Sequence, residues 1–280
     1  MNYTRPEEQL RHTIERATAA LAHFAYKGLQ QNLESLRLAR VSQVLMTSGC
    51  SARGSYYWDS LAEHIAKTQH ADGGWADVEE TLWSLGYLSF FGDRYCRELA
   101  RGNAWVISAR LPCGAWGKSS RDQPRIPITC LVSILLPSLV GRETLFWVSE
   151  QWGVDLASPT PLTYKGAFYL LSTSHCQAYS NEKLVEDTIE FIEREQNEDG
   201  GFGPWREHPI GSCPWITGVV LWGLSKAPLK VSNDTLIRAT SWLESTQLSN
   251  GLWPYHYLDD ATAMALIGLS SVLPLVIKQD

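Results

Sequence analysis

The chain has 280 residues, of which 44% are hydrophobic and twelve are tryptophan, and its formal net charge is −6 at pH 7. It carries no run of basic residues, so we expect no nucleic-acid partner. The first residues, MNYTRPEEQLRHTIERA, lack the apolar core of a secretory signal, and the six cysteines show no CxxC spacing. We therefore expect a cytoplasmic protein with reduced thiols, and we leave open its oligomeric state and any peripheral contact with a membrane.

The first predicted element is a helical hairpin over about residues 1–57. Its first helix begins after a capping Thr4, with Pro6 just inside the helix, and ends near residues 22–28 (AHFAYKG). The remainder, about residues 58–280, is built from an internal repeat. Because the repeat runs through most of the chain, we expect one domain over residues 1–280.

The repeat consists of Gln, three residues, Gly, one residue and an aromatic residue. Three copies have identical spacing and a fourth has Arg in place of Gln: Gln69–Gly73–Trp75, Arg110–Gly114–Trp116, Gln196–Gly200–Phe202 and Gln247–Gly251–Trp253. An aliphatic residue lies four positions before each copy. The copies start 41 residues apart (69 and 110) and then 86 apart (110 and 196), which predicts a degenerate copy near residue 151, in FWVSEQWG (146–153). One period before the first copy lies at residues 22–28, so we count six units.

Each unit predicts two helices of different character. The first, as in residues 181–196 (NEKLVEDTIEFIEREQ), combines charges with an apolar stripe at helical spacing, and the repeat glycine ends it. The second, as in residues 216–224 (ITGVVLWGL), is almost entirely apolar or small. Six outer helices alternating with six inner helices predict an all-α fold, an α6–α6 toroid. An open solenoid would need polar end repeats, whereas this chain ends in the apolar segment SVLPLVI.

The repeat resembles the QW motif of the squalene-hopene and oxidosqualene cyclases and of their prenyltransferase relatives. In that family the Gln stacks on the aromatic residue and ties neighbouring outer helices together, so the resemblance implies a structural role for the repeat. Residues 73–81 (GGWADVEET) are similar to the DxDDT acid motif of class II terpene cyclases, with Glu79 at the position of the central Asp. With room for one toroid, the chain looks like the single-domain class II cyclases of the merosterolic acid synthase type.

Two groups of carboxylic acids begin apolar inner helices, and either could give the initiating proton of a class II cyclase to an alkene or epoxide. The predicted catalytic residues are Asp77, Glu79, Glu80, Asp259 and Asp260. Crowded carboxyls in an apolar site can hold a proton near neutral pH, because burial and like charge both disfavour ionisation. Glu79 stands two residues before Thr81, as Asp260 stands two before Thr262, and the choice between the groups stays open. Capping of the helices is the alternative role.

Aromatic residues near the inner helices are expected to shield the resulting cation from water and to stabilise it with their ring faces. The predicted substrate-binding rings include Trp83, Tyr87, Phe90, Trp116, Tyr164, Phe168, Trp215 and Trp222. Three further residues of the predicted binding site flank Asp259 and Asp260 and could donate to the acid or hold its proton: Tyr255, His256 and Tyr257. Each ring alone is more typical of packing. Arg121 and Arg125, in the longest loop before an inner helix, are predicted to hold an anionic head group, with solvated loop charge as the alternative.

The expected function is class II cyclisation of a linear polyprenyl chain, on a prenylated aromatic acid (a meroterpenoid) or another terpenoid. Such an enzyme is an isomerase or intramolecular lyase, its ligand is a lipophilic isoprenoid, and it needs no cofactor. A zinc-dependent prenyltransferase-like subunit is disfavoured because no Asp-x-Cys pattern occurs, so we predict no metal site. A non-catalytic toroid that binds a lipid or a protein is the other alternative, and it predicts acids that face solvent.

Overall fold

The computed structural model describes residues 6–49, 56–174 and 181–277, and in these ranges it contains twelve α-helices and no strand. The outer helices are α1 (Pro6–Gln30), α3 (Tyr56–Lys67), α5 (Cys96–Ser108), α7 (Arg142–Leu156), α9 (Glu182–Arg194) and α11 (Asn233–Thr246). The inner helices are α2 (Ser35–Thr47), α4 (Val78–Leu88), α6 (Ile126–Leu135), α8 (Thr163–Ser174), α10 (Pro214–Ser225) and α12 (Leu258–Ile277). Two 3-10 helices, η1 (Ser89–Tyr95) and η2 (Pro137–Leu139), follow α4 and α6.

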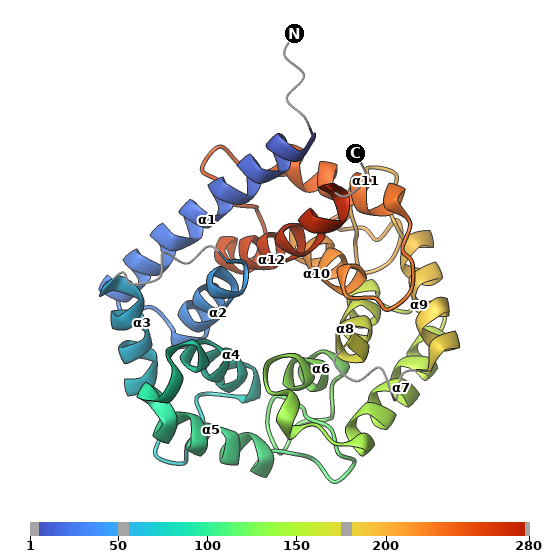
Figure 1. The fold of residues 1–280 in the computed structure, drawn as a ribbon. Coiled ribbons are helices and arrows are strands. Elements are labelled where there is room, and N and C mark those ends of the chain that lie inside the picture. The colour runs from blue at the N-terminus through green and yellow to red at the C-terminus, as the bar shows by residue number, and fades with distance from the viewer. Residues whose placement is uncertain (1–5, 50–55, 175–180, 278–280) are drawn as a thin grey trace.

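The inner helices form a closed ring that the outer helices surround (Figure 1). Each inner helix packs against the next one along the chain, and the last, α12, packs against both α1 and α2. The first and last hairpins are therefore neighbours, as a closed ring requires. The predicted α6–α6 toroid is confirmed, and the open solenoid is excluded.

Burial separates the two layers in the way that the sequence pattern predicts. On outer helix α9, Val185, Ile189 and Ile192 are buried and Glu190 faces solvent. On inner helix α10, nearly every residue is buried. Among the described helices, α12 is apolar and long enough to cross a membrane by length and composition, but 61% of that stretch is buried, against α10, α1 and α2. We interpret α12 as a core helix of the ring.

The inner helices α10 and α12 are in backbone contact. A Cβ atom added to Gly218 would lie 2.3 Å from the carbonyl oxygen of Met264, and one added to Gly268 would lie 2.3 Å from the carbonyl oxygen of Gly218. Real Cβ atoms do not approach other atoms so closely, so both positions require glycine. Small residues thus let this part of the inner wall close tightly.

The glutamines of the repeat tie neighbouring units together. The Gln69 side-chain amide donates to the carbonyl of the glycine in its own turn at 2.8 Å and to that of Glu98 on the next outer helix, α5, at 2.9 Å. Gln196 and Gln247 repeat this pair of contacts on α11 and α1 respectively. Because Gln247 reaches Thr13 of α1, the last repeat fastens the last outer helix to the first.

The aromatic residues of the repeat join each outer helix to the following inner helix. The Trp75 indole N–H donates to the carbonyl of Ile65, the aliphatic residue four positions before the repeat, at 3.1 Å. Trp116 and Trp253 make the equivalent contacts at 2.7 and 2.9 Å. The Trp75 backbone N–H donates to the hydroxyl of Thr81, at the start of α4, at 3.0 Å. The repeat is therefore a structural element at the junction of two helices.

The degenerate copy of the repeat that was predicted near residue 151 is wrong. Residues 146–153 lie inside α7, and Gln151 is exposed there. This unit is instead fastened by Trp152, whose indole N–H donates to the hydroxyl of Thr188 on α9 at 2.7 Å. The first outer helix, which was predicted to end near residues 22–28, ends at Gln30, and the six predicted units are present. The predicted cap, Thr4, lies outside the described residues.

Candidate active site

The N-terminal ends of the inner helices, together with the loops that precede them, form one end of the ring, which we call the mouth. Every inner helix follows an outer one, so the inner helices of the closed ring run in the same direction. The backbone N–H of Val78, where α4 begins, donates to the carbonyl of Lys118 in the loop before α6 at 2.9 Å. The positive ends of the helix dipoles converge here, and they favour carboxylates.

The two predicted acid groups lie together at the mouth, and Arg40 on α2 joins them. Arg40 Nη1 lies 3.6 Å from Glu79 Oε1, and Arg40 Nη2 lies 3.3 Å from Asp260 Oδ1. The three side chains are only 9%, 20% and 19% exposed, respectively. The sequence presented two alternative sites, whereas the structure contains one site with a carboxyl from each group.

Asp260 is a largely buried carboxyl that lies beside another acid. Burial raises its pKa, and the nearby Glu79 acts in the same direction, while the positive charge of Arg40 and a hydrogen bond from Trp215 act against this rise. The net direction of the pKa is upward. The Trp215 indole N–H donates to Oδ1 at 3.0 Å, and the Arg40 contact is also to Oδ1. A proton on Oδ2 would therefore displace neither contact.

Glu79 has more positive charge around it than Asp260 has. Lys118 Nζ lies 3.4 Å from Glu79 Oε2, on the side away from the oxygen that faces Arg40. Two cations therefore lie against Glu79 and one lies against Asp260. The two carboxyls therefore differ in their surroundings, because more positive charge lies against Glu79 than against Asp260.

Three other predicted catalytic acids have structural partners. Asp77 caps α4, since its Oδ1 accepts from the backbone N–H of Glu80 at 2.8 Å. Asp259 is fully buried and forms a salt bridge with Arg37, whose Nε donates to Asp259 Oδ2 at 3.1 Å. Glu80 is half-buried, and burial raises its pKa. Asp77 and Asp259 therefore shape the mouth, and Glu80 is the remaining acid with a raised pKa on α4.

Several of the predicted aromatic residues surround Asp260. The Tyr164 ring packs edge-on against Trp215, with the ring centroids 6.0 Å apart, and Trp215 contacts Asp260 directly. Tyr255 interacts with Asp260 electrostatically and hydrogen-bonds to Cys213. These rings are partly exposed, so they are accessible from the mouth. Two further predicted rings lie beside them: His256 packs on Tyr255, and Tyr257 covers the Arg37 guanidinium at 5.0 Å.

The other predicted rings lie in the wall of the toroid or outside it. Tyr87 faces outward and donates from its hydroxyl to the carbonyl of Trp58 on α3 at 2.9 Å, and Trp116 belongs to a repeat turn. Phe90 was expected on an inner helix, but it lies in η1 and is 45% exposed, so this expectation is wrong. The remaining rings are nearly fully buried as core residues: Trp83, Phe168 and Trp222.

Arg121 and Arg125 line a cavity of about 670 Å³ at the mouth, beside α7 and α8. Tyr164 lines the same cavity, together with two residues that sequence reasoning missed, Trp147 and Lys165. The other missed residue with a role at the site is Arg40. Its signal was present, because Arg40 is the one charged residue in the segment LARVSQVLM, and an arginine is rarely buried in an inner helix without an acidic partner.

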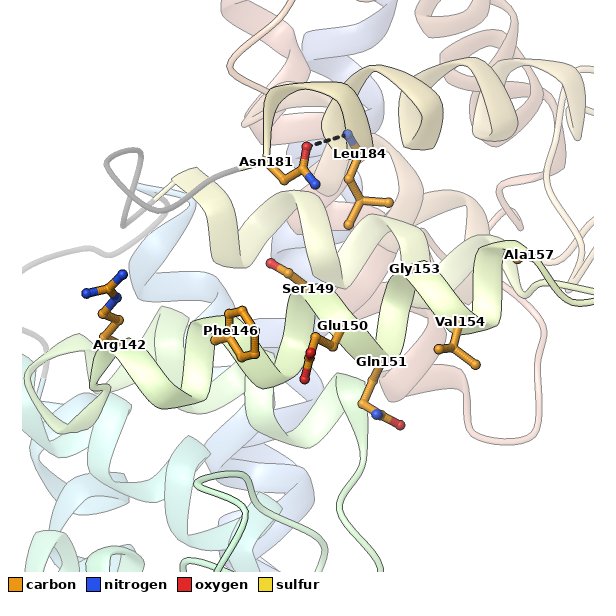
Figure 2. Close-up of a pocket in the computed structure, with 10 residues that line it drawn as sticks. All are labelled: Arg142, Phe146, Ser149, Glu150, Gln151, Gly153, Val154, Ala157, Asn181 and Leu184. Atoms are coloured by element: carbon orange, nitrogen blue, oxygen red, sulfur yellow. Dashed lines mark hydrogen bonds between the residues drawn. The ribbon is translucent and has the colours of Figure 1, made fainter.

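A larger cavity, of about 1130 Å³, lies outside the ring between α7 and the start of α9 (Figure 2). Figure 2 shows its side chains projecting from the outer face of α7 toward solvent. Phe146 and Val154 there are 63% and 68% exposed. None of the acids or rings predicted from the sequence lines this cavity, so the mouth is the better candidate site.

No protein-family model matches the sequence, and no curated protein matches it. Among solved structures, the type II terpene cyclase MstE from Scytonema has a TM-score of 0.77 at 16% identity, over 97% of this chain and 100% of that chain. A variant of MstE in complex with geranylgeranyl dihydroxybenzoate, its substrate, has a TM-score of 0.76 at 15% identity, over 96% and 99% of the two chains.

Two other enzymes share the fold more distantly. The ent-copalyl diphosphate synthase from Streptomyces platensis has a TM-score of 0.57 at 15% identity, over 84% of this chain and 50% of that chain. The unsaturated glucuronyl hydrolase from Bacillus sp. GL1 has a TM-score of 0.60 at 11% identity, over 91% and 96%. The enzymes with this fold catalyse different reactions, so the fold does not identify the reaction, and the function has to be inferred from the residues of the site. The comparisons show that this chain has the toroid fold of the type II terpene cyclase structures.

Proposed function

We propose that the protein is a class II terpene cyclase that starts cyclisation of a linear polyprenyl chain with a proton from Asp260. The observation that carries this proposal is a largely buried carboxyl with a raised pKa, held between Arg40 and Trp215 and bordered by aromatic rings. Burial shifts such a carboxyl toward its protonated form, which is the form that an acid catalyst uses next to an apolar substrate. The shared fold with MstE supports the same assignment.

In the proposed reaction, Asp260 Oδ2 donates its proton to one carbon of the terminal alkene. The cation then forms on the neighbouring carbon and is attacked by the next double bond of the chain, which closes a ring. Trp215, Tyr164 and Tyr255 border the acid and would stabilise the cation without offering a nucleophile to it. Loss of a proton ends the sequence, so substrate and product are isomers of equal mass. The released proton passes to water at the mouth, and Asp260 takes up a new proton from there; the negative charge of Glu79 favours this step, whereas Arg40 opposes it.

The proposed substrate is a prenylated aromatic acid. MstE binds geranylgeranyl dihydroxybenzoate as its substrate and merosterolic acid A as its product. We extend that substrate class to this chain because its mouth combines an acid, aromatic rings and a cationic cavity. A cytoplasmic, single-domain enzyme with an isoprenoid ligand is part of the same proposal.

The alternative of a non-catalytic toroid receives no support from the acids. That alternative predicts carboxylates that face solvent, whereas Glu79 and Asp260 are 20% and 19% exposed and lie against one buried arginine. Within residues 6–49, 56–174 and 181–277, no group of three His, Cys, Asp or Glu side chains could hold a metal ion. The prenyltransferase alternative, which needs such a zinc site, therefore gains no support from the described residues.

The test is to incubate the protein with geranylgeranyl dihydroxybenzoate and, separately, with geranylgeranyl diphosphate. We expect the aromatic acid to give new products of unchanged mass in liquid chromatography with mass spectrometry, and we expect full activity after exhaustive chelation. Recovery of both substrates unchanged would contradict the proposal. Activity that is lost on chelation and restored only by zinc would instead support the prenyltransferase alternative.

A further inference from the structure

The cavity at the mouth has the size of a binding site for a small molecule, and its lining combines charged side chains with two aromatic rings. Its volume of about 670 Å³ lies within the usual range for ligand sites. The loop of residues 117–125 forms one side, and Trp147 from α7 and Tyr164 from α8 contribute aromatic rings. Tyr164 also packs against Trp215, which contacts Asp260, so the cavity adjoins the acid site through two successive rings.

The charges in the cavity leave one cation uncompensated. Arg125 Nε lies 2.7 Å from Asp122 Oδ2, and Lys165 Nζ lies 2.7 Å from Asp155 Oδ2. Arg121 also lines the cavity, and among the described residues it has no carboxylate within ion-pair distance. The lining as a whole therefore has a net charge of +1, which suits a ligand with a single negative charge.

The loop that carries Arg121 is held in place by Asp122. Asp122 accepts hydrogen bonds from the backbone N–H groups of Lys118, at 3.0 Å, and Gln123, at 2.8 Å, as well as from the Arg125 side chain. The bond from Arg125, followed by that from Lys118, lowers the pKa of Asp122 to about 2. Asp122 is therefore a permanent anion that fixes the turn. A fixed loop presents a cation to a ligand at a smaller entropic cost than a mobile one.

We propose that this cavity binds the head group of the substrate, and that it selects an aromatic monocarboxylate over a diphosphate. The carboxylate pairs with Arg121, and the ring packs between Trp147 and Tyr164. A diphosphate carries more negative charge than one uncompensated cation can balance, and it has no ring for the aromatic walls. This inference rests on the proposed function for the prenyl tail, but it makes a separate claim about where the head group binds.

The experiment is a ligand-observed NMR titration of the full chain with 3,4-dihydroxybenzoate, with pyrophosphate as competitor. We expect saturable binding that Arg121→Gln weakens about fivefold, the size expected for one partly exposed ion pair. Trp147→Ala should weaken it as well. The matched control is Arg97→Gln, which removes an exposed arginine from α5, outside the mouth, and should leave binding unchanged. Circular dichroism checks that each variant is folded.

Asp260→Asn separates this inference from the proposed function. We expect this variant to bind dihydroxybenzoate as well as the wild type does while it fails to cyclise the prenylated acid. One outcome is that neither the wild type nor any variant cyclises a substrate, while binding of dihydroxybenzoate still depends on Arg121. That outcome supports the head-group site and overturns the cyclase proposal. Binding that is absent, or that Arg121→Gln leaves unchanged, overturns the head-group site. Displacement of dihydroxybenzoate by an equal concentration of pyrophosphate overturns the preference for a monocarboxylate.

Discussion

Arg40 is a buried cation that serves two carboxyls. Removing water from a charged side chain is costly, and a buried arginine persists only where partners compensate its charge. Here the compensation comes from Glu79 and Asp260 at 3.6 and 3.3 Å, on helices to either side of α2. Lys118 pairs Glu79 from outside and also lies 3.6 Å from Asp77, so two cations and these two carboxylates balance, and one proton on Asp260 leaves the group neutral. The residues thus form one cluster around a buried arginine.

The first prediction concerns the two carboxyls. Asp260→Asn keeps the shape of the side chain and can still accept from Trp215, but it cannot donate the initiating proton. We expect it to lower the rate of cyclisation by about 10³-fold or more, because general acid catalysis is here the first step. Glu79→Gln should reduce the rate only about tenfold, through altered charge balance. Single-turnover assays with mass-spectrometric detection measure both. A larger loss in Glu79→Gln than in Asp260→Asn would reverse the assignment.

The second prediction concerns Arg40. Burial raises the pKa of Asp260 and Arg40 opposes this rise, so Arg40→Gln should raise the pKa further. An acid catalyst works in its protonated form, so activity falls as pH rises through the pKa of Asp260. We therefore expect the alkaline limb of the kcat/KM profile to move to higher pH in Arg40→Gln.

Arg40→Lys is the control for this shift, because it keeps the charge but loses the two-pronged geometry. It should leave the alkaline limb closer to its wild-type position than Arg40→Gln does. A purely structural role for Arg40 would lower activity at every pH in both variants and leave the limb in place.

At the scale of the element, the inner helices depend on close backbone packing and the outer helices do not. A Cβ at Gly218 on α10 would meet the Met264 carbonyl at 2.3 Å, whereas one at Gly153 on α7 would have no atom within 4 Å. Both positions lie inside helices, so intrinsic helix propensity favours alanine at both. The two sites therefore separate the effect of packing from that of propensity.

The third prediction follows from this contrast. Gly218→Ala should lower the free energy of unfolding by about 2 kcal/mol or more, because the backbone of α12 must move away. Gly153→Ala should raise it by about 0.5–1 kcal/mol, because a mid-helix glycine gains helix propensity. Urea unfolding of the two variants measures both changes. Equal effects in the two variants would show that α10 and α12 are less tightly packed than described.

The elements themselves could be predicted because each unit repeats one pattern of amphipathic and apolar helices. The prediction failed at residues 146–153, where the period was right but the turn was absent. A repeat turn needs a glycine in the left-handed region, as at Gly73 and Gly251, whose φ values are 103° and 84°. Gly153 instead lies within α7. Spacing alone cannot distinguish a glycine that ends a helix from one inside it.

At the scale of the whole molecule, closure of the ring brings the first and last hairpins together. Gln247 donates to the Thr13 carbonyl at 3.0 Å, and Arg16 Nη2 donates to the Leu248 carbonyl at 2.6 Å. These contacts join residues more than two hundred positions apart, and α12 packs on α1 and α2 behind them. The first hairpin is therefore held in place by the last.

The fourth prediction tests this closure. Gln247→Ala removes two hydrogen bonds and should lower the free energy of unfolding by about 1–3 kcal/mol. Hydrogen exchange should become faster in α1 and α11 together, because they lose their common contact. Gln69→Ala removes the same kind of pair between α3 and α5, so there the faster exchange should occur in those helices. Faster exchange spread evenly around the ring in both variants would contradict a local role.

The sequence predicted the toroid fold and the acids at the starts of two inner helices. It did not predict that Arg40 brings Glu79 and Asp260 together in one site. Arg40 is 39 positions from Glu79 and 220 from Asp260, so no local spacing connects the three residues. Their meeting depends on α2 lying between α4 and α12, which follows only once the ring is known to be closed. The aromatic residues were harder still, because an inner helix has apolar residues on every face. The sequence therefore does not distinguish Tyr87 from Trp215. In the structure Tyr87 contacts α3, whereas Trp215 contacts Asp260.

The position of Asp260 on the last helix has a consequence for synthesis. A growing chain makes Arg40 early and Asp260 very late, so most of the toroid leaves the ribosome before this counter-ion of Arg40 exists. Until α12 is made, α4 is the one inner helix beside α2. Of the two carboxyls that pair with Arg40, Glu79 alone is then present. The cluster around Arg40 is thus assembled in the final step of ring closure. A chain that ends before residue 258 would have five of the six inner helices and no acid site.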